Sequence, residues 1–157
     1  MSSARIRPVR LLLAALAAAA LLFSGAVTAT PASATASSLD GAWACSVPTG
    51  YVYDQVQMNR NCSGGGSWGS PQFHLRTPVD GLTACVSSPG FTYDYISWGS
   101  ACSQIAGVQS NQYHLRTPYS GLWSCDVPAK FTYSATTQNL DCAIVQGVPT
   151  TKFQLLG

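Results

Sequence analysis

The chain has 157 residues, of which only 9% are charged, and it contains six Asp and no Glu. Three of its eight basic residues lie within the first ten positions, so the remainder carries five basic against six acidic side chains, a net charge of −1. That balance leaves no basic patch for nucleic acid and no polybasic segment for anionic lipid, and we expect neither as a partner.

The first predicted element is a secretory signal peptide. The basic residues at the start precede an apolar run at 11–23, and small-residue sites at 32–34 and 34–36 fit cleavage after residue 34 or 36. The apolar run is shorter than the ~20 residues that a membrane-spanning helix needs. Residues 1–34 are therefore expected to be removed, which leaves a secreted, extracellular protein with no membrane segment.

The remaining chain, residues 39–157, is predicted to be a single domain of three repeats. Its sequence recurs every 40 residues without an insertion, as 41–80, 81–120 and 121–157. A fixed period of this length is typical of repeat architectures in which each copy forms one supersecondary unit. Five positions are the same in every copy: Gly41, Gly81 and Gly121; Cys45, Cys85 and Cys125; Tyr53, Tyr93 and Tyr133; Cys62, Cys102 and Cys142; Leu75, Leu115 and Leu155.

Within a repeat, apolar residues alternate with polar ones, which predicts strands. In the third copy the alternation covers 122–127, 131–134 and 152–156. Turn residues follow the first of these segments in every copy, so we expect the first two strands to form a hairpin. Each repeat has room for four short strands, and we expect no helix after the signal peptide. Recurrent aromatic residues are expected to fill the core: Tyr51, Phe91 and Phe131; Tyr53, Tyr93 and Tyr133; Phe73, Tyr113 and Phe153.

The six cysteines, two per repeat, are predicted to form three disulfides in an oxidising compartment. The repeat symmetry leaves two pairings: each repeat closes on itself, or each second Cys bonds to the first Cys of the next repeat. We favour closure within repeats, since a strand and its returning neighbour bring two α-carbons within disulfide reach. The cysteine spacing does not match a zinc site, and we expect neither a metal nor another cofactor. The favoured pairs are Cys45 with Cys62, Cys85 with Cys102, and Cys125 with Cys142.

The segment Ser-Asn-Gln-Tyr-His-Leu at 110–115, followed by Gly-Leu-Trp-Ser-Cys at 121–125, resembles the signature of ricin-type lectins. Together with the two cysteines per repeat, the resemblance covers nearly all of residues 39–157. It implies an all-β, three-fold fold, a β-trefoil-like barrel with one disulfide per repeat. His74 and His114 occupy the position where the family places Trp. The family's sugar-binding Asp is replaced by Val47, Ser87 and Val127, so we transfer no binding residue from the family.

The two histidines are candidate ligand-binding residues. His74 and His114 occupy equivalent positions, each two residues before an arginine, Arg76 and Arg116. A repeated His-x-Arg on an exposed strand face indicates either ordinary solvent-exposed residues or a row of ligand-binding side chains, rather than a catalytic base. The sequence also lacks a nucleophile elbow, a phosphate loop and a catalytic carboxylate pair, so we expect no enzymatic activity.

Two tryptophans are the other candidate ligand-binding residues, because they depart from the repeat. Trp68 lies in a Gly-rich stretch at 64–69 that the first repeat alone contains, and Trp98 stands where the other copies have Met58 and Gln138. Each is either a stacking platform for a ligand or a cap on the barrel end. Trp43 and Trp123, by contrast, share one repeat position, which favours a structural role.

Two function classes remain open. The first is a non-enzymatic carbohydrate-binding, lectin-like module, and the second is a protein-binding protein such as a protease inhibitor or an accessory subunit of an exported assembly. A lectin would present several weak equivalent sites, whereas an inhibitor would bind one partner tightly through one loop. The expected partner is thus a glycan or an extracellular protein, and the expected state is a monomer.

Overall fold

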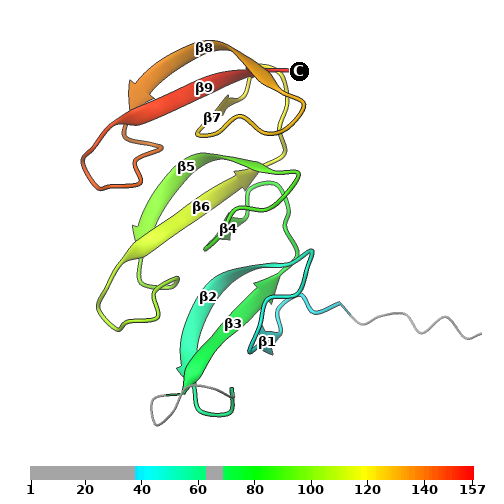
Figure 1. Ribbon diagram of the computed structural model, residues 1–157, viewed down its shortest axis with the longest axis vertical. Coiled ribbons are helices and arrows are strands. Elements are labelled where there is room, and N and C mark those ends of the chain that lie inside the picture. Colours follow the sequence, from blue (N-terminus) through cyan, green and yellow to red (C-terminus); the bar gives the residue numbers. More distant parts are fainter. Residues whose placement is uncertain (1–37, 63–68) are drawn as a thin grey trace, which may run out of the picture. The chain divides into compact units, whose positions relative to one another are not determined.

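The structure, a computed structural model, describes residues 38–62 and 69–157, which belong to a unit running from Ala36 to Gly157. Every element of regular secondary structure in this part of the chain is a β-strand (Figure 1). Within the same ranges, no helix is long and apolar enough to cross a membrane. The predicted signal peptide and Trp68 lie outside the described residues.

Each repeat forms one antiparallel sheet with one short and two long strands (Figure 1). The strand that comes last in the repeat lies in the middle, so the orders are β1-β3-β2, β4-β6-β5 and β7-β9-β8. The all-β prediction is confirmed, as three similar units. The strands are β1 (Trp43–Ala44), β2 (Val52–Asn59), β3 (Ser70–Arg76), β4 (Thr83–Ala84), β5 (Thr92–Gly99), β6 (Ser110–Arg116), β7 (Trp123–Ser124), β8 (Thr132–Asn139) and β9 (Thr150–Leu156).

The prediction that the first two strands of a repeat form a hairpin is wrong. The turn between them does form, since the Tyr51 N–H donates to Pro48 O at 3.2 Å. However, β1 pairs with β3, with Trp43 opposite His74, and β2 pairs with β3 on the other side. The same turn chemistry therefore carries the chain from one edge of the sheet to the other, and each repeat has three strands instead of four.

One leucine on the middle strand forms the buried centre of each repeat. Leu75, Leu115 and Leu155 are the largest fully buried side chains of the described residues. The predicted aromatic core is formed only in part. The rings of the aromatic pairs across the long strands lie 4.8, 5.0 and 5.2 Å apart. Their tyrosines are half-buried in the first two repeats, but Tyr133 is exposed in the third, where no described repeat covers β8.

The prediction of one disulfide within each repeat is confirmed. The α-carbons of the three pairs lie 5.4, 5.3 and 5.3 Å apart, within the usual range for a bridge. Each bridge ties the segment after the short strand to the segment after the first long strand. Three such bridges indicate a protein that works in an oxidising environment, outside the reducing cytosol.

An equivalent backbone hydrogen bond joins the first repeat to the second and the second repeat to the third. Cys85 N–H donates to Tyr53 O at 2.7 Å, and Cys125 N–H donates to Tyr93 O at 2.8 Å. No backbone hydrogen bond between described residues joins the third repeat to the first. The three sheets remain separate and form no closed barrel within the described ranges, so the β-trefoil-like barrel stays a prediction.

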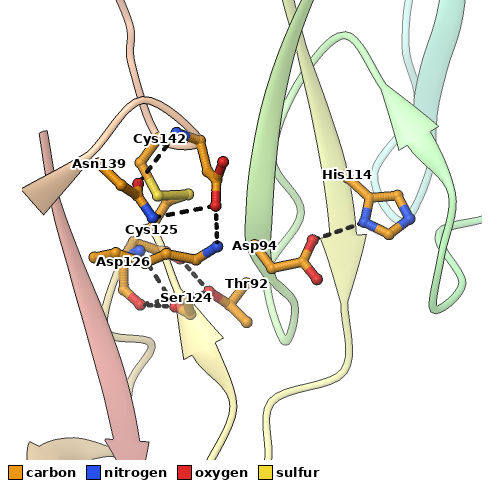
Figure 2. Close-up of a disulfide and its surroundings, with 10 residues drawn as sticks. Thr92, Asp94, His114, Ser124, Cys125, Asp126, Asn139 and Cys142 are labelled. Carbon is orange, nitrogen blue, oxygen red and sulfur yellow. Dashed lines mark hydrogen bonds and ion pairs between the residues drawn. A yellow bond between two sulfur atoms is a disulfide. The ribbon is translucent and has the colours of Figure 1, made fainter. Parts of the chain in front are cut away.

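Side chains at the two junctions differ in polarity but match their partners. Val52 is buried against Ala84 and Leu115 at the first junction. At the second junction, Thr92 lies 2.7 Å from the Ser124 hydroxyl and also donates to Asp126, as Figure 2 shows. An apolar side chain thus faces an apolar surface, and a hydroxyl faces hydroxyl and carboxylate groups, so each junction satisfies its own polar atoms.

Lys130 is the one non-glycine residue with a positive φ among the described residues, and it stands where the other repeats have Gly50 and Gly90. Its φ of 74° lies in the left-handed region, where a Cβ costs about 1 kcal/mol or more. We expect Lys130→Gly to raise the free energy of unfolding by about 0.5 kcal/mol, measured by urea denaturation. Ala129→Gly in the same turn is the control and should lower it, and a loss with Lys130→Gly would contradict this account of the turn.

Candidate functional site

A β-bulge in the first repeat aims Asp54 at the middle strand. Tyr53 lies opposite Leu75 and Gln55 lies opposite His74, so Asp54 has no partner of its own in the strand pairing. An extra residue of this kind bends the strand locally and redirects a side chain. Asp54 and Gln55 thus share the position opposite His74, and the Asp54 carboxylate lies beside the side chains of His74 and Arg76 on β3.

Asp54 joins His74 and Arg76 into one group. Asp54 Oδ1 lies 2.6 Å from His74 Nδ1, and Asp54 Oδ2 accepts a hydrogen bond of 2.7 Å from Arg76 Nη1. Because an ionised carboxylate oxygen only accepts, His74 carries a hydrogen on Nδ1, and in the neutral form of the ring Nε2 is then an acceptor. Asp40 lies 3.5 Å from Arg76 Nε and accepts from the Thr77 N–H at 2.6 Å. We name Asp40, Asp54, His74 and Arg76 the first cluster.

The second repeat contains the same arrangement. Asp94 Oδ1 lies 2.7 Å from His114 Nδ1 (Figure 2), and Asp94 Oδ2 accepts from Arg116 Nη1 at 2.7 Å. Asp80 accepts from Arg116 Nε at 3.2 Å. We name Asp80, Asp94, His114 and Arg116 the second cluster. Forty residues further on, the four equivalent positions are all uncharged: Ser120, just before the third repeat, and Ser134, Gln154 and Leu156 within it.

Trp43 distinguishes the first cluster from the second. It lies directly opposite His74 on β1, and the two ring centroids are 5.1 Å apart. Trp43 remains 39% exposed, so part of its indole faces solvent beside an ordered polar group. The second repeat has Thr83 at this place, opposite His114. The third repeat keeps the tryptophan, Trp123, opposite Gln154 but lacks the charged cluster. Trp and cluster therefore occur together only in the first repeat.

Hydrogen bonds to the ionised side chains set the electrostatics of both clusters. The Thr77 backbone N–H, the larger cause, and the Arg76 guanidinium lower the pKa of Asp40 below its usual value. The Asp54 carboxylate raises the pKa of Arg76, chiefly through its hydrogen bond. Apart from His74, the two carboxylates and one guanidinium of the first cluster carry a net charge of −1. Its donors and acceptors are thus fixed in place before any ligand arrives.

The lowered pKa of Asp80 predicts how stability depends on pH. The Thr117 backbone N–H, the largest cause, and the Arg116 side chain both favour the ionised carboxylate. A group whose pKa is lower in the folded state stabilises the fold above its unfolded pKa, here 3.8, and loses that contribution as the pH falls through its folded pKa. We expect the melting temperature to decrease when the pH is lowered below about 4. The Asp80→Asn variant should have a lower melting temperature than the wild type at pH 7, and its melting temperature should decrease less on acidification. The same pH dependence in both proteins would contradict the assignment.

The structure brings together some of the predicted site residues and separates others. His74 meets Arg76 through Asp54, and His114 meets Arg116 through Asp94. Trp98 lies half-buried on β5, opposite Asn111, and belongs to neither cluster. Trp68 lies outside the described residues.

Sequence reasoning missed the four aspartates and Trp43. One signal was present: Asp precedes His by 20 positions in both the first and second repeats, and all members of the cluster disappear together in the third. Side chains that are kept or lost as a set across the repeats of one chain are expected to touch. Trp43 was assigned a structural role because of its repeat, yet it is partly exposed beside His74.

The clusters lie on an open surface. The described residues enclose no pocket and hold no group of three or more His, Cys, Asp or Glu side chains arranged for a metal ion. Such a surface can bind a flat or extended ligand by stacking on Trp43 and by hydrogen bonds to His74 Nε2 and to the carboxylates. Comparisons with protein-family models, with curated proteins and with solved structures found no match.

Proposed function

We propose that this protein is a secreted, non-enzymatic carbohydrate-binding protein, and that Trp43 and the first cluster form its glycan site. The observation that carries the proposal is a partly exposed indole 5.1 Å from an imidazole that a carboxylate holds in one orientation. A sugar ring offers a C–H face that stacks on an aromatic ring and hydroxyls that bond to fixed planar groups. The site offers both kinds of contact side by side.

The open surface supports a weak site rather than a tight one. A ligand that stacks on one exposed ring keeps most of its own surface in water, so we expect a dissociation constant near the millimolar range. The export signal in the sequence and the three disulfides support action outside the cell. An open surface also favours binding over catalysis, since a reaction site excludes water from the reacting atoms.

The resemblance to ricin-type lectins agrees with this proposal but does not carry it. The 40-residue period and the three similar sheets with one disulfide each support a relationship to the β-trefoil. A trefoil requires the third sheet to close on the first, and the contacts between described residues do not include that closure. The glycan site lies within the first repeat, so the proposal holds with or without a closed barrel.

Pull-down with insoluble cellulose, chitin and starch tests the function. Trp43→Ala should reduce binding to the polysaccharide that retains the protein by about tenfold or more, because a partly exposed aromatic anchor is lost. Trp123→Ala is the matched control, since Trp123 has the same place in the third repeat but lacks the charged cluster. Equal losses in the two variants would contradict the assigned site, and retention on none of the three polysaccharides would oppose a glycan function.

Protein binding is the second candidate, and one observation favours it. Among the described residues, the long edge of β8 has no backbone partner of the kind that β2 and β5 each have in the next repeat. An uncovered strand edge can pair with a strand of another protein. A protease inhibitor or an accessory subunit would use such an edge, and binding of one protein from the growth medium, unaffected by Trp43→Ala, would favour this reading.

A further inference from the structure

The third repeat exposes on β8 a surface that is buried in the other two repeats. Val52 and Thr92 begin the first long strand of their repeats, and each is 1% exposed because the next repeat covers it. Thr132 has the same position in the third repeat and is exposed, and its neighbour Tyr133 is 51% exposed. One junction surface of the kind that joins the repeats is thus left uncovered on β8.

The first repeat carries the complementary uncovered surface. Ala84 and Ser124 are fully buried where they receive the preceding repeat, whereas Ala44 in the first repeat is only half-buried. Likewise Cys85 is buried at its junction, whereas Cys45 is exposed. The described residues therefore expose two different surfaces, each equivalent to one half of a junction that the chain already forms twice.

The backbone groups of the two surfaces are complementary as well. At the existing junctions, Val56 N–H donates to Ala101 O at 2.8 Å and Ile96 N–H donates to Asp141 O at 2.7 Å. The equivalent groups at the ends are the Thr136 N–H and Asn61 O. A second pair, Tyr133 O and the Cys45 N–H, is equivalent to the carbonyl and amide that join the repeats beside the first Cys. None of these four groups forms such a bond to a described residue.

The side chains at the two ends also fit together. A threonine already occupies this position at the second junction, as Thr92, and an alanine already receives it at the first, as Ala84. A contact between Thr132 and Ala44 would therefore combine the threonine side of the second junction with the alanine side of the first. Ser46 stands in the place of Asp126, which accepts from the Thr92 hydroxyl, so it supplies a hydroxyl for Thr132.

We propose that these surfaces bind each other between copies, the third repeat of one chain to the first repeat of the next, head to tail. The occupant is a second copy because this chain carries the complementary surface in the same sequence register. An interface between two different surfaces continues into rings or filaments unless it is blocked. The monomer expected from the sequence would leave both uncovered edges in water.

Two variants, each with one end blocked, test the proposal on the full-length chain, expressed in an exporting host. Thr136→Pro removes the amide hydrogen at the third-repeat end, and proline is tolerated at an uncovered edge. Ala44→Arg fills the receiving site at the first-repeat end. In analytical ultracentrifugation, the average mass of the wild type should rise with concentration, and each variant alone should remain a monomer. An equimolar mixture should form a dimer and stop there, since each variant keeps the end that the other lacks.

Circular dichroism melting identifies a variant that fails to fold, and Thr132→Arg replaces Thr136→Pro in that case. Thr137→Ala, one residue away, is the control and should associate like the wild type. A wild type that stays monomeric up to millimolar concentration overturns the proposal. So does a monomeric mixture of folded variants, or association of both variants alone. A monomer whose Thr136 amide exchanges slowly with deuterium would show closure onto the first repeat of its own chain, which also overturns it.

Discussion

Replacing Leu155 with Ala is expected to lower the free energy of unfolding by about 2 to 5 kcal/mol. The side chain is 1% exposed at the centre of the third repeat. Its truncation removes apolar area and leaves a cavity that the flanking strands β7 and β8 cannot fill without moving. The Leu155 backbone also bonds to Leu122 and Gly121, so a shift of the strand to fill the cavity would strain these bonds. Urea denaturation of the folded protein measures the loss.

The adjacent residue provides a matched control. Leu156 is the same residue type on the same strand but is 50% exposed, so Leu156→Ala should cost less than about 1 kcal/mol. The ratio between the two neighbours tests whether the third repeat has its own buried centre. Similar losses in the two variants would contradict the orientation of β9.

Removing the central disulfide is the second change with a large expected effect. Cys85 and Cys102 are 17 positions apart, and a loop of this length corresponds to about 3 kcal/mol of stabilisation in the loop-entropy model. The Cys85→Ala/Cys102→Ala double variant should therefore lose about 3 kcal/mol, measured by thermal and urea unfolding.

The terminal disulfide supplies the comparison for this prediction. Cys125 and Cys142 enclose a loop of the same length, so their double replacement should cost a similar amount. Mass spectrometry of a proteolytic digest should recover only bridges within repeats. A bridge from Cys62 to Cys85, or a central double variant as stable as the wild type, would contradict the pairing.

The sequence was sufficient to predict the features that depend on local pattern and repetition. The strands, the turn after the first strand and the disulfide within each repeat follow from alternation, turn residues and the 40-residue period. Strand order did not follow, because a turn such as the one before Tyr51 has the same local chemistry whether the chain folds back or crosses the sheet. Pairing of β1 with β3 is decided by contacts about thirty residues apart.

The burial of side chains was likewise predictable only in part. Recurrence correctly marked Leu115 and Tyr93 as scaffold, but it could not tell which of them lies at the centre. That depends on which side of a strand the next repeat covers. Tyr133 illustrates this, since it is the same residue as Tyr53 and Tyr93 but is exposed, because no described repeat covers it.

The candidate site was the least predictable part, because it depends on which strands pair and in which register. Only when Tyr53 on β2 lies opposite Leu75 on β3 does Asp54 come beside His74 and Arg76. The His-x-Arg pattern was visible on the strand, but its acidic partner was not. Trp43 joins the site through a pairing between strands that the predicted hairpin did not include.

The central claim is that Trp43 and the first cluster bind glycans, and NMR of the histidine side chains tests it most directly. The chain has two histidines, one in each cluster, so two imidazole signals report on both. His114→Gln, the residue type of the third repeat, assigns them. Titration with cello- and chito-oligosaccharides should shift the His74 signal and leave the His114 signal nearly unchanged, since Thr83 replaces the tryptophan there. A glycan that binds the protein without moving the His74 signal would contradict the claim.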